Sequence, residues 1–112
     1  MKGRMFLDDE QRPLYEIKAN LFKALAHPAR IRALEILSAA EGGTATVAEL
    51  LHGMDIEPSH LSQHLRVLRR HQVVTSERRA SHVHYTLAHP GISELLDIAR
   101  VFLGDRMNAG RS

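Results

Sequence analysis

The 112-residue sequence contains no cysteine and no tryptophan, and only 4% of its residues are aromatic. The lack of cysteine excludes disulfides, thiol redox chemistry and thiolate metal sites, so any transition-metal site must use other ligands. Few aromatic residues disfavour a protein that stacks the bases of single strands. No apolar run approaches the roughly 18 residues that span a bilayer. Since the N-terminal stretch also lacks a signal peptide's apolar core, we expect a cytoplasmic protein.

The length of the chain predicts one small domain. Because a domain of this size buries only about two-thirds of its unfolded surface, a dimer is expected. Residues 1–12 lack apolar periodicity and are predicted to be a flexible N-terminal arm. Residues 13–107 are predicted to form the folded domain, and residues 108–112 a flexible tail.

Four main helices are expected from apolar spacing and from proline. Apolar residues recur at helical spacing from Leu14 onwards. Proline suits the first turn of a helix, where its missing N–H is not needed. Pro28, Pro58 and Pro90 each precede a segment with helical apolar spacing. They therefore predict the starts of three further helices.

A short helix and a hairpin complete the pattern. Thr46 and Glu49 have the spacing of a capping box, which predicts a short helix there. Residues 73–75 and 82–87 have strand character, and residues 77–81 are expected to form the hairpin tip. The predicted fold is therefore mainly α with a β-hairpin (α+β). Its order, α-α-α-α-β-β-α, is that of a winged helix-turn-helix.

Positive charge is concentrated in one segment. The whole chain has a formal net charge of +2, whereas residues 58–84 carry five arginines and one glutamate. A basic segment on a near-neutral body is typical of proteins that bind polyanions. The alternative is an ordinary solvated helix face, which an isolated charge run often is.

The helix expected after Pro58 is amphipathic. Leu61, Leu65 and Leu68 share one narrow face, and polar side chains occupy the opposite face and the flanks. Glutamine can pair with adenine and arginine with guanine in the major groove, while arginines at a hairpin tip reach the backbone or the minor groove. The residues predicted to contact DNA are Ser59, His60, Ser62, Gln63, Arg66, Arg69, Arg70, Arg78 and Arg79.

The segments 21–37, 46–51, 60–74 and 82–87 together resemble the ArsR/SmtB family of bacterial winged-helix repressors. The similarity is most specific in LAHPAR, at the entry to the second helix, and in LSQHL, within the fourth. It covers roughly residues 14–105.

The resemblance implies a homodimer whose first and last helices form the interface, a palindromic DNA operator, repression, and control by an effector. The interface residues expected on these two helices are Leu14, Ile17, Leu21, Leu95, Ile98 and Phe102.

The sequence departs from the family at its sensor sites. Thr46 and Ala48 stand where the family's thiolate sensor has cysteines. The positions that match the family's interface zinc site are His89, Gly91, Phe102 and Asp105, and two of these four cannot bind a metal. Both sites are therefore expected to be lost.

Two glycines that the family usually has are also missing. Gln72 follows the fourth helix and Ala80 lies at the tip of the hairpin.

Histidines remain as candidate ligands for an effector metal. His82 and His84 lie on the same side of the second strand and, with His89 or a residue of a partner chain, could hold Ni²⁺ or Zn²⁺. The alternative for this pair is a solvated sheet face. His27 is expected to cap the second helix.

Two other classes of function were compared with a DNA-binding regulator. A winged-helix protein-interaction module without DNA binding is supported only by the two missing glycines. An enzyme is not expected, because the sequence has no nucleophile beside a base, no phosphate-binding loop and no H-E-x-x-H motif.

Overall fold

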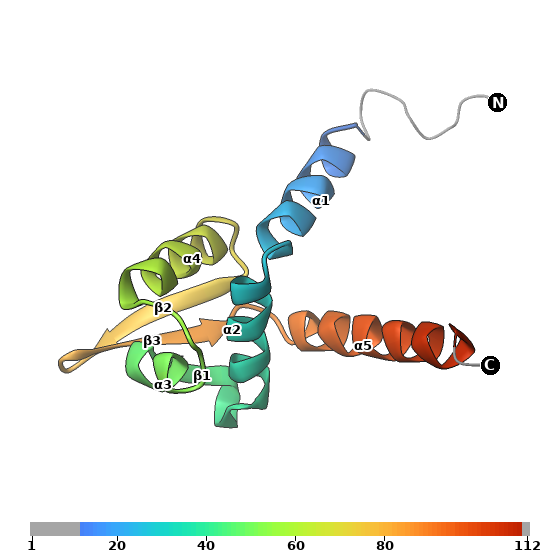
Figure 1. The fold of residues 1–112 in the computed structure, drawn as a ribbon. Helices are drawn as coiled ribbons and strands as arrows, with labels where there is room; N and C mark the ends of the chain where they lie inside the picture. Colours follow the sequence, from blue (N-terminus) through green and yellow to red (C-terminus); the bar gives the residue numbers. More distant parts are fainter. Residues whose placement is uncertain (1–11, 111–112) are drawn as a thin grey trace.

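The computed structural model describes residues 12–110, and these form five α-helices and a three-stranded antiparallel sheet. The predicted winged helix-turn-helix is confirmed (Figure 1). The helices are α1 (Arg12–Leu25), α2 (Pro28–Ala39), α3 (Val47–His52), α4 (Pro58–Arg70) and α5 (Gly91–Gly110). The strands are β1 (Thr44–Thr46), β2 (Val74–Arg79) and β3 (His82–Leu87), and a 3-10 turn (Glu41–Gly43) precedes β1.

The domain boundaries differ slightly from those expected. α1 begins at Arg12, one residue before the expected start of the domain, and α5 continues through residues 108–110, which were assigned to a tail. The rest of the expected arm and tail lies outside the described residues. None of the helices in the described part of the chain is long and apolar enough to cross a membrane.

The core lies where α2, α3 and α4 pack against the sheet. The three leucines on the apolar face of α4, Leu61, Leu65 and Leu68, are at most 1% exposed, which confirms the predicted inner face of this helix. Complete burial of such a side chain contributes about 1.5–3 kcal/mol to folding. The other side chains that are fully buried are those of Leu34, Leu37, Leu50, Val73 and Val74.

Both predicted helix caps are present. The Nδ1 atom of His27 accepts a hydrogen bond from the Ala29 N–H at 3.0 Å and so caps α2. At α3, the Glu49 N–H donates to Thr46 Oγ1 at 3.2 Å, and the Thr46 N–H donates to Glu49 Oε1 at 2.8 Å. The hydrogen bond from the Thr46 N–H is also the main reason why the pKa of the Glu49 carboxyl is lowered. These caps satisfy backbone donors that have no partner within the helix.

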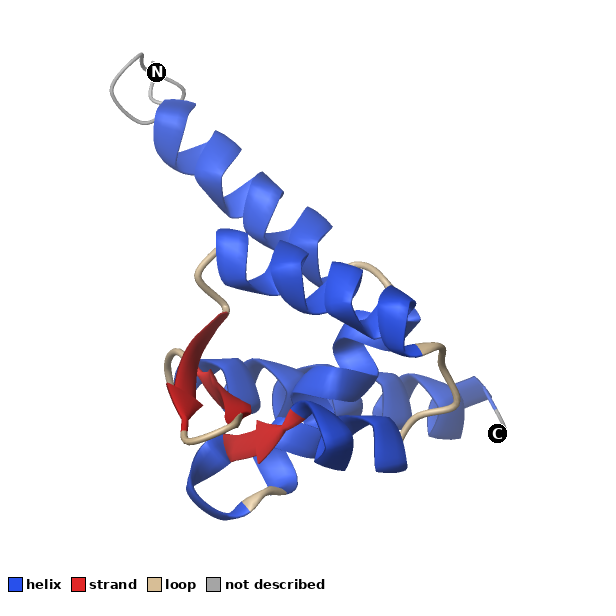
Figure 2. Cartoon of the chain, turned by 90° about the vertical axis from the view of Figure 1, so that its left-hand side faces the viewer, coloured by secondary structure: helices blue, strands red, loops and turns tan. Residues whose placement is uncertain are grey.

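Strand β1 was not predicted. It pairs antiparallel with β3, so the strand order is β1-β3-β2 (Figure 2). Buried Ala45 lies opposite Tyr85, and the Thr86 hydroxyl donates to Thr44 Oγ1 at 3.0 Å. Three residues are too few to show an alternating pattern, so only the partner strand identifies them as a strand.

The hairpin turn is shorter than the sequence indicated. Arg79 and His82 pair directly, which leaves Ala80 and Ser81 as the two turn residues. Ala80 has a φ of 55° and Gln72 a φ of 61°, and both angles lie in the left-handed region. These are the two positions where the family usually has glycine, so the backbone keeps the conformation that glycine favours.

Replacing Ala80 by glycine is expected to stabilise the protein by about 1 kcal/mol, because a left-handed conformation costs a residue with a Cβ atom about that much. The measurement is thermal unfolding at one fixed protein concentration. An increase of a few degrees in Tm is expected. The matched control is Ala99→Gly on exposed helix α5, which should lower the stability by a similar amount. An Ala80→Gly variant that unfolds at a lower temperature would contradict the strain argument.

Candidate nucleic-acid interface

The polar face of α4 lies open to solvent. The buried leucines hold α4 against the core, so the side chains on the opposite face of this helix point outward from a rigid element. All nine residues predicted to contact DNA have exposed side chains: Ser59, His60, Ser62, Gln63, Arg66, Arg69, Arg70, Arg78 and Arg79. The structure thus leaves each of them accessible, and their contacts with DNA stay a prediction.

The wing is attached to α4 by a hydrogen bond. Arg69 near the end of α4 donates from its guanidinium to the Ser76 hydroxyl of β2 at 3.2 Å. Because alternate residues of a strand share a face, Arg78 lies on the same face of β2 as Ser76 and buried Val74. The wing therefore presents Arg78 on the side of the sheet that faces α4, which makes one continuous basic surface.

Arg79 occupies the other face of the wing. It donates to Glu77 Oε1 at 3.2 Å, and both side chains are more than half exposed. An exposed ion pair of this kind contributes little to stability. The two arginines were predicted to have the same role, but they lie on opposite faces of the wing. Arg78 lies on the face towards α4, and Arg79 does not.

Helices α1 and α5 project from the body (Figure 1). Both helices expose apolar side chains. The radius of gyration is 17.0 Å, whereas a compact domain of this length has about 13 Å. Four of the six predicted interface residues, Leu14, Ile17, Ile98 and Phe102, are 57–67% exposed. The other two, Leu21 and Leu95, are half-buried against the core.

Further exposed apolar side chains extend this surface beyond the predicted residues. They are Tyr15, Phe22, Val101, Leu103 and Met107. Helical spacing places Val101 beside Ile98, which is the signal that could have identified it. A hydrogen bond of 2.5 Å between the hydroxyls of Ser38 and Ser93 holds the start of α5 against α2. The start of α5 is thus connected directly to α2.

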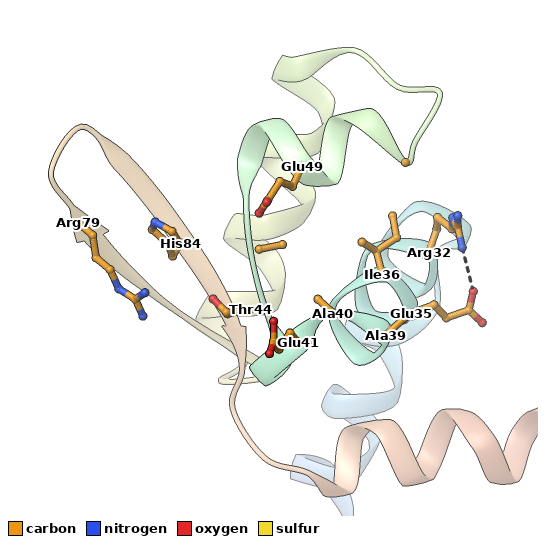
Figure 3. A pocket seen from close by; sticks show the side chains of 12 residues that line it. Arg32, Glu35, Ile36, Ala39, Ala40, Glu41, Thr44, Glu49, Arg79 and His84 are labelled. Atoms are coloured by element: carbon orange, nitrogen blue, oxygen red, sulfur yellow. Dashed lines mark ion pairs between the residues drawn. The ribbon is translucent and has the colours of Figure 1, made fainter.

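The three candidate metal ligands do not form one cluster. His89 accepts from the Gly91 N–H at 2.8 Å through its Nδ1 atom at the start of α5. His84 instead lines a cavity of about 680 Å³ between α2, β1, α3 and the wing (Figure 3). Over residues 12–110, no three histidine, aspartate or glutamate side chains are placed to hold a metal ion. A site at His82 and His84 would therefore need a further ligand that does not come from residues 12–110 of the same protomer.

Comparison with known proteins agrees with this architecture. A family model described as a helix-turn-helix domain matches residues 25–77. An uncharacterised HTH-type transcriptional regulator of Mycobacterium tuberculosis, Rv0081, is 48% identical over 95 residues, which cover 84% of this chain and 81% of the relative. Its crystal structure superposes with a TM-score of 0.79 at 44% identity, covering 89% of this chain and 98% of that one.

Two more distant proteins are also similar. The homodimeric winged helix-turn-helix DNA-binding domain of Mb0332 from Mycobacterium bovis has a TM-score of 0.80 at 21% identity, covering 97% of this chain and 95% of that one. At this identity the likeness shows the fold alone. The transcriptional repressor SdpR of Bacillus subtilis is 29% identical over 68 residues, which cover 61% of this chain and 72% of the relative.

Proposed function

The chain belongs to the ArsR/SmtB family of transcriptional regulators and carries the family's DNA-binding winged helix, and from this premise we propose that it acts as a homodimeric repressor at a palindromic operator. Regulators of this family are a non-enzymatic class. In the proposed complex, α4 enters the major groove and the wing contacts the adjacent backbone or minor groove.

The exposed face of α4 is the observation that carries the proposal. Gln63 and Arg66 lie on it opposite the buried leucines, so they can reach base edges while the helix stays anchored. Arg78 on the neighbouring side of the wing adds a cation for the phosphate backbone. These polar side chains lie on an exposed helix face, whereas small-molecule substrates usually bind in a concave site.

The exposed apolar surfaces of α1 and α5 support the dimer. Monomeric proteins rarely expose large contiguous apolar patches, so such surfaces are typical of interfaces. The homodimeric state of the Mb0332 domain fits the same arrangement. A symmetric dimer places two copies of α4 on one side, about one helical turn of DNA apart, which matches a palindromic operator.

Repression is the mode of regulation that the resemblance to the family implies. A dimer that covers a promoter excludes the polymerase, and the name of the relative SdpR as a transcriptional repressor is consistent with this mode. The same protein on an upstream operator would activate transcription. Mapping the operator relative to the transcription start therefore decides the sign of regulation.

A divalent metal ion is the proposed effector. His82 and His84 offer two imidazoles on one face of β3, and Ni²⁺ or Zn²⁺ is the class of effector that suits them. Because residues 12–110 of one protomer supply no third ligand near them, metal control through this pair requires a further ligand from elsewhere, such as the partner subunit or solvent.

The alternative, a protein-interaction module, is less well supported than DNA binding. It depended on the two absent glycines, but Gln72 and Ala80 take the left-handed conformation that glycine would take. The end of α4 and the wing therefore keep the shape that a DNA-binding wing needs.

Binding to the protein's own promoter region is expected to be specific and strongly dependent on salt. If a dimer contacts about 6–10 phosphates, the affinity should fall about 10³–10⁵-fold between 50 and 200 mM salt. The measurement is a titration of promoter DNA and of a scrambled duplex of equal length at several salt concentrations. Equal, micromolar-or-weaker binding to both duplexes at physiological salt would count against the proposal.

A further inference from the structure

The two motifs that carry the family resemblance touch each other in the fold. LAHPAR spans the turn from α1 to α2, and LSQHL lies in α4, yet the rings of His27 and His64 are 4.2 Å apart at their centroids. Neither ring is needed for the contacts with DNA proposed above. The contact between the two rings therefore has a role other than binding DNA directly.

Arg30 extends this contact to a third element. Its Nε atom donates to the Ala24 carbonyl at 2.6 Å, and a terminal nitrogen lies 3.4 Å from the Lys23 carbonyl. Both carbonyls belong to the last turn of α1, where carbonyl groups lack partners within the helix. The other terminal nitrogen lies 3.2 Å from His64 Nδ1. One half-buried guanidinium thus joins the end of α1 to the middle of α4.

The hydrogen bond to Arg30 defines the state of the His64 ring. A guanidinium only donates, so His64 Nδ1 must accept, and the ring must be the neutral tautomer with its proton on Nε2. Burial lowers the pKa of His64, and nearby charges lower it further; these belong to His27, Arg30 and His60. On the side of α1, the hydrogen bonds of the described residues connect Arg30 to two neutral carbonyl groups, those of Lys23 and Ala24.

We propose that Arg30 and His64 are positioning residues that fix the orientation of α4 relative to α1, and that a proton on His64 releases this connection. The proposal rests on the function proposed above, in which α1 belongs to the dimer interface and α4 enters the major groove. In a dimer, the connection sets the distance between the two copies of α4. It therefore controls which spacing of operator half-sites the protein accepts.

The pH dependence follows from the position of the proton. Unfolding would return His64 to an ordinary pKa, about 6.5, which is higher than in the folded protein. The neutral His64 ring therefore stabilises the folded protein fully when the pH is above its ordinary pKa. This stabilisation is lost as the pH falls from the ordinary pKa towards the lower pKa of the folded protein. Below that range His64 is positively charged beside Arg30 and can no longer accept its hydrogen bond.

The test uses the full chain and two pairs of variants. Arg30→Lys keeps the charge but cannot bridge three acceptors, and His64→Leu keeps the packing but loses the acceptor. His64→Asn keeps an acceptor near the position of Nδ1 and does not titrate, so it is the matched rescue variant. Arg32→Lys, on an exposed part of α2, is the control for Arg30→Lys.

Operator affinity is measured with two duplexes. In one, the half-sites have their native spacing; in the other, the spacing differs by one base pair. We expect Arg30→Lys and His64→Leu to lose about 10-fold or more at native spacing and to lose the preference for that spacing, with unchanged affinity for scrambled DNA. The wild-type protein should lose its spacing preference as the pH falls below the ordinary histidine pKa, about 6.5, whereas His64→Asn should keep it. A variant that was only unstable would bind less of every duplex.

Ring NMR of His64 provides a readout that needs no DNA. The neutral ring should carry its proton on Nε2, and Arg30→Lys should raise the pKa of His64. A proton on Nδ1 at neutral pH, or an Arg30→Lys protein with wild-type affinity and spacing preference, would overturn the inference. If the wild-type protein binds no operator while the NMR result holds, the proposed function is wrong, and so is the role of Arg30 and His64 in positioning α4 on DNA. Failure of the proposed function is thus distinguishable from failure of the inference.

Discussion

Replacing Gln63 and Arg66 together by alanine is expected to reduce operator affinity at least about 100-fold. Each bidentate contact with a base contributes about 1–3 kcal/mol of discrimination, and a dimer loses the contacts in both half-sites. Affinity for scrambled DNA should fall much less, because Arg69, Arg70 and Arg78 still provide charge for the phosphates. The two duplexes are compared by titration at one salt concentration.

The fold should survive this change. Both side chains are exposed, and alanine is the best helix former, so α4 keeps its leucine contacts. Arg100→Ala is the matched control, since it removes an exposed arginine of α5 that pairs only weakly with Asp97 at 3.5 Å. A double variant that still binds the operator as tightly as the control would show that Gln63 and Arg66 do not contact bases.

Replacing Phe102 by glutamate is expected to convert the dimer into monomers at micromolar concentration. Phe102 is 61% exposed in the protomer and lies near Ile98 and Val101 on one face of α5. A two-fold axis would bury the new charge twice, and an unpaired buried charge costs about 3–5 kcal/mol. The measurement is the mass in solution by sedimentation or light scattering.

Loss of the dimer should also weaken operator binding by about 10²-fold or more. Two linked half-site contacts benefit from a high effective concentration, and separate monomers lose it. Gly104→Glu is the matched control, because it adds the same charge on the opposite side of α5, where a new Cβ atom meets nothing within 4 Å. If both glutamate variants remain dimeric, α5 lies outside the interface and another surface must form it.

Most of the fold and the exposed face of α4 could be predicted from local patterns. Pro28 and Pro58 mark helix starts, Thr46 and Glu49 form the capping box, and three leucines at helical spacing define the buried side of α4. These signals work because each depends on residues within about one or two helical turns. The contact residues on α4 follow directly, since a buried face determines which side chains point away from it.

The remaining features depend on partners that are distant in the chain. Strand β1 exists only because β3 lies beside it, and the register of the wing places Arg78 and Arg79 on opposite faces. The connection from Arg30 to His64 joins residues 34 positions apart, and no spacing rule relates them.

By itself, the sequence determined the order of the helices, the basic character of the segment from α4 to the wing, and the absence of thiolate chemistry. Only the tertiary structure decided that α1 and α5 project with their apolar faces uncovered, and that α4 is fastened to the end of α1. The reason is physical: local patterns report which side of an element is apolar, whereas the docking of elements depends on side chains that meet only after the chain has folded.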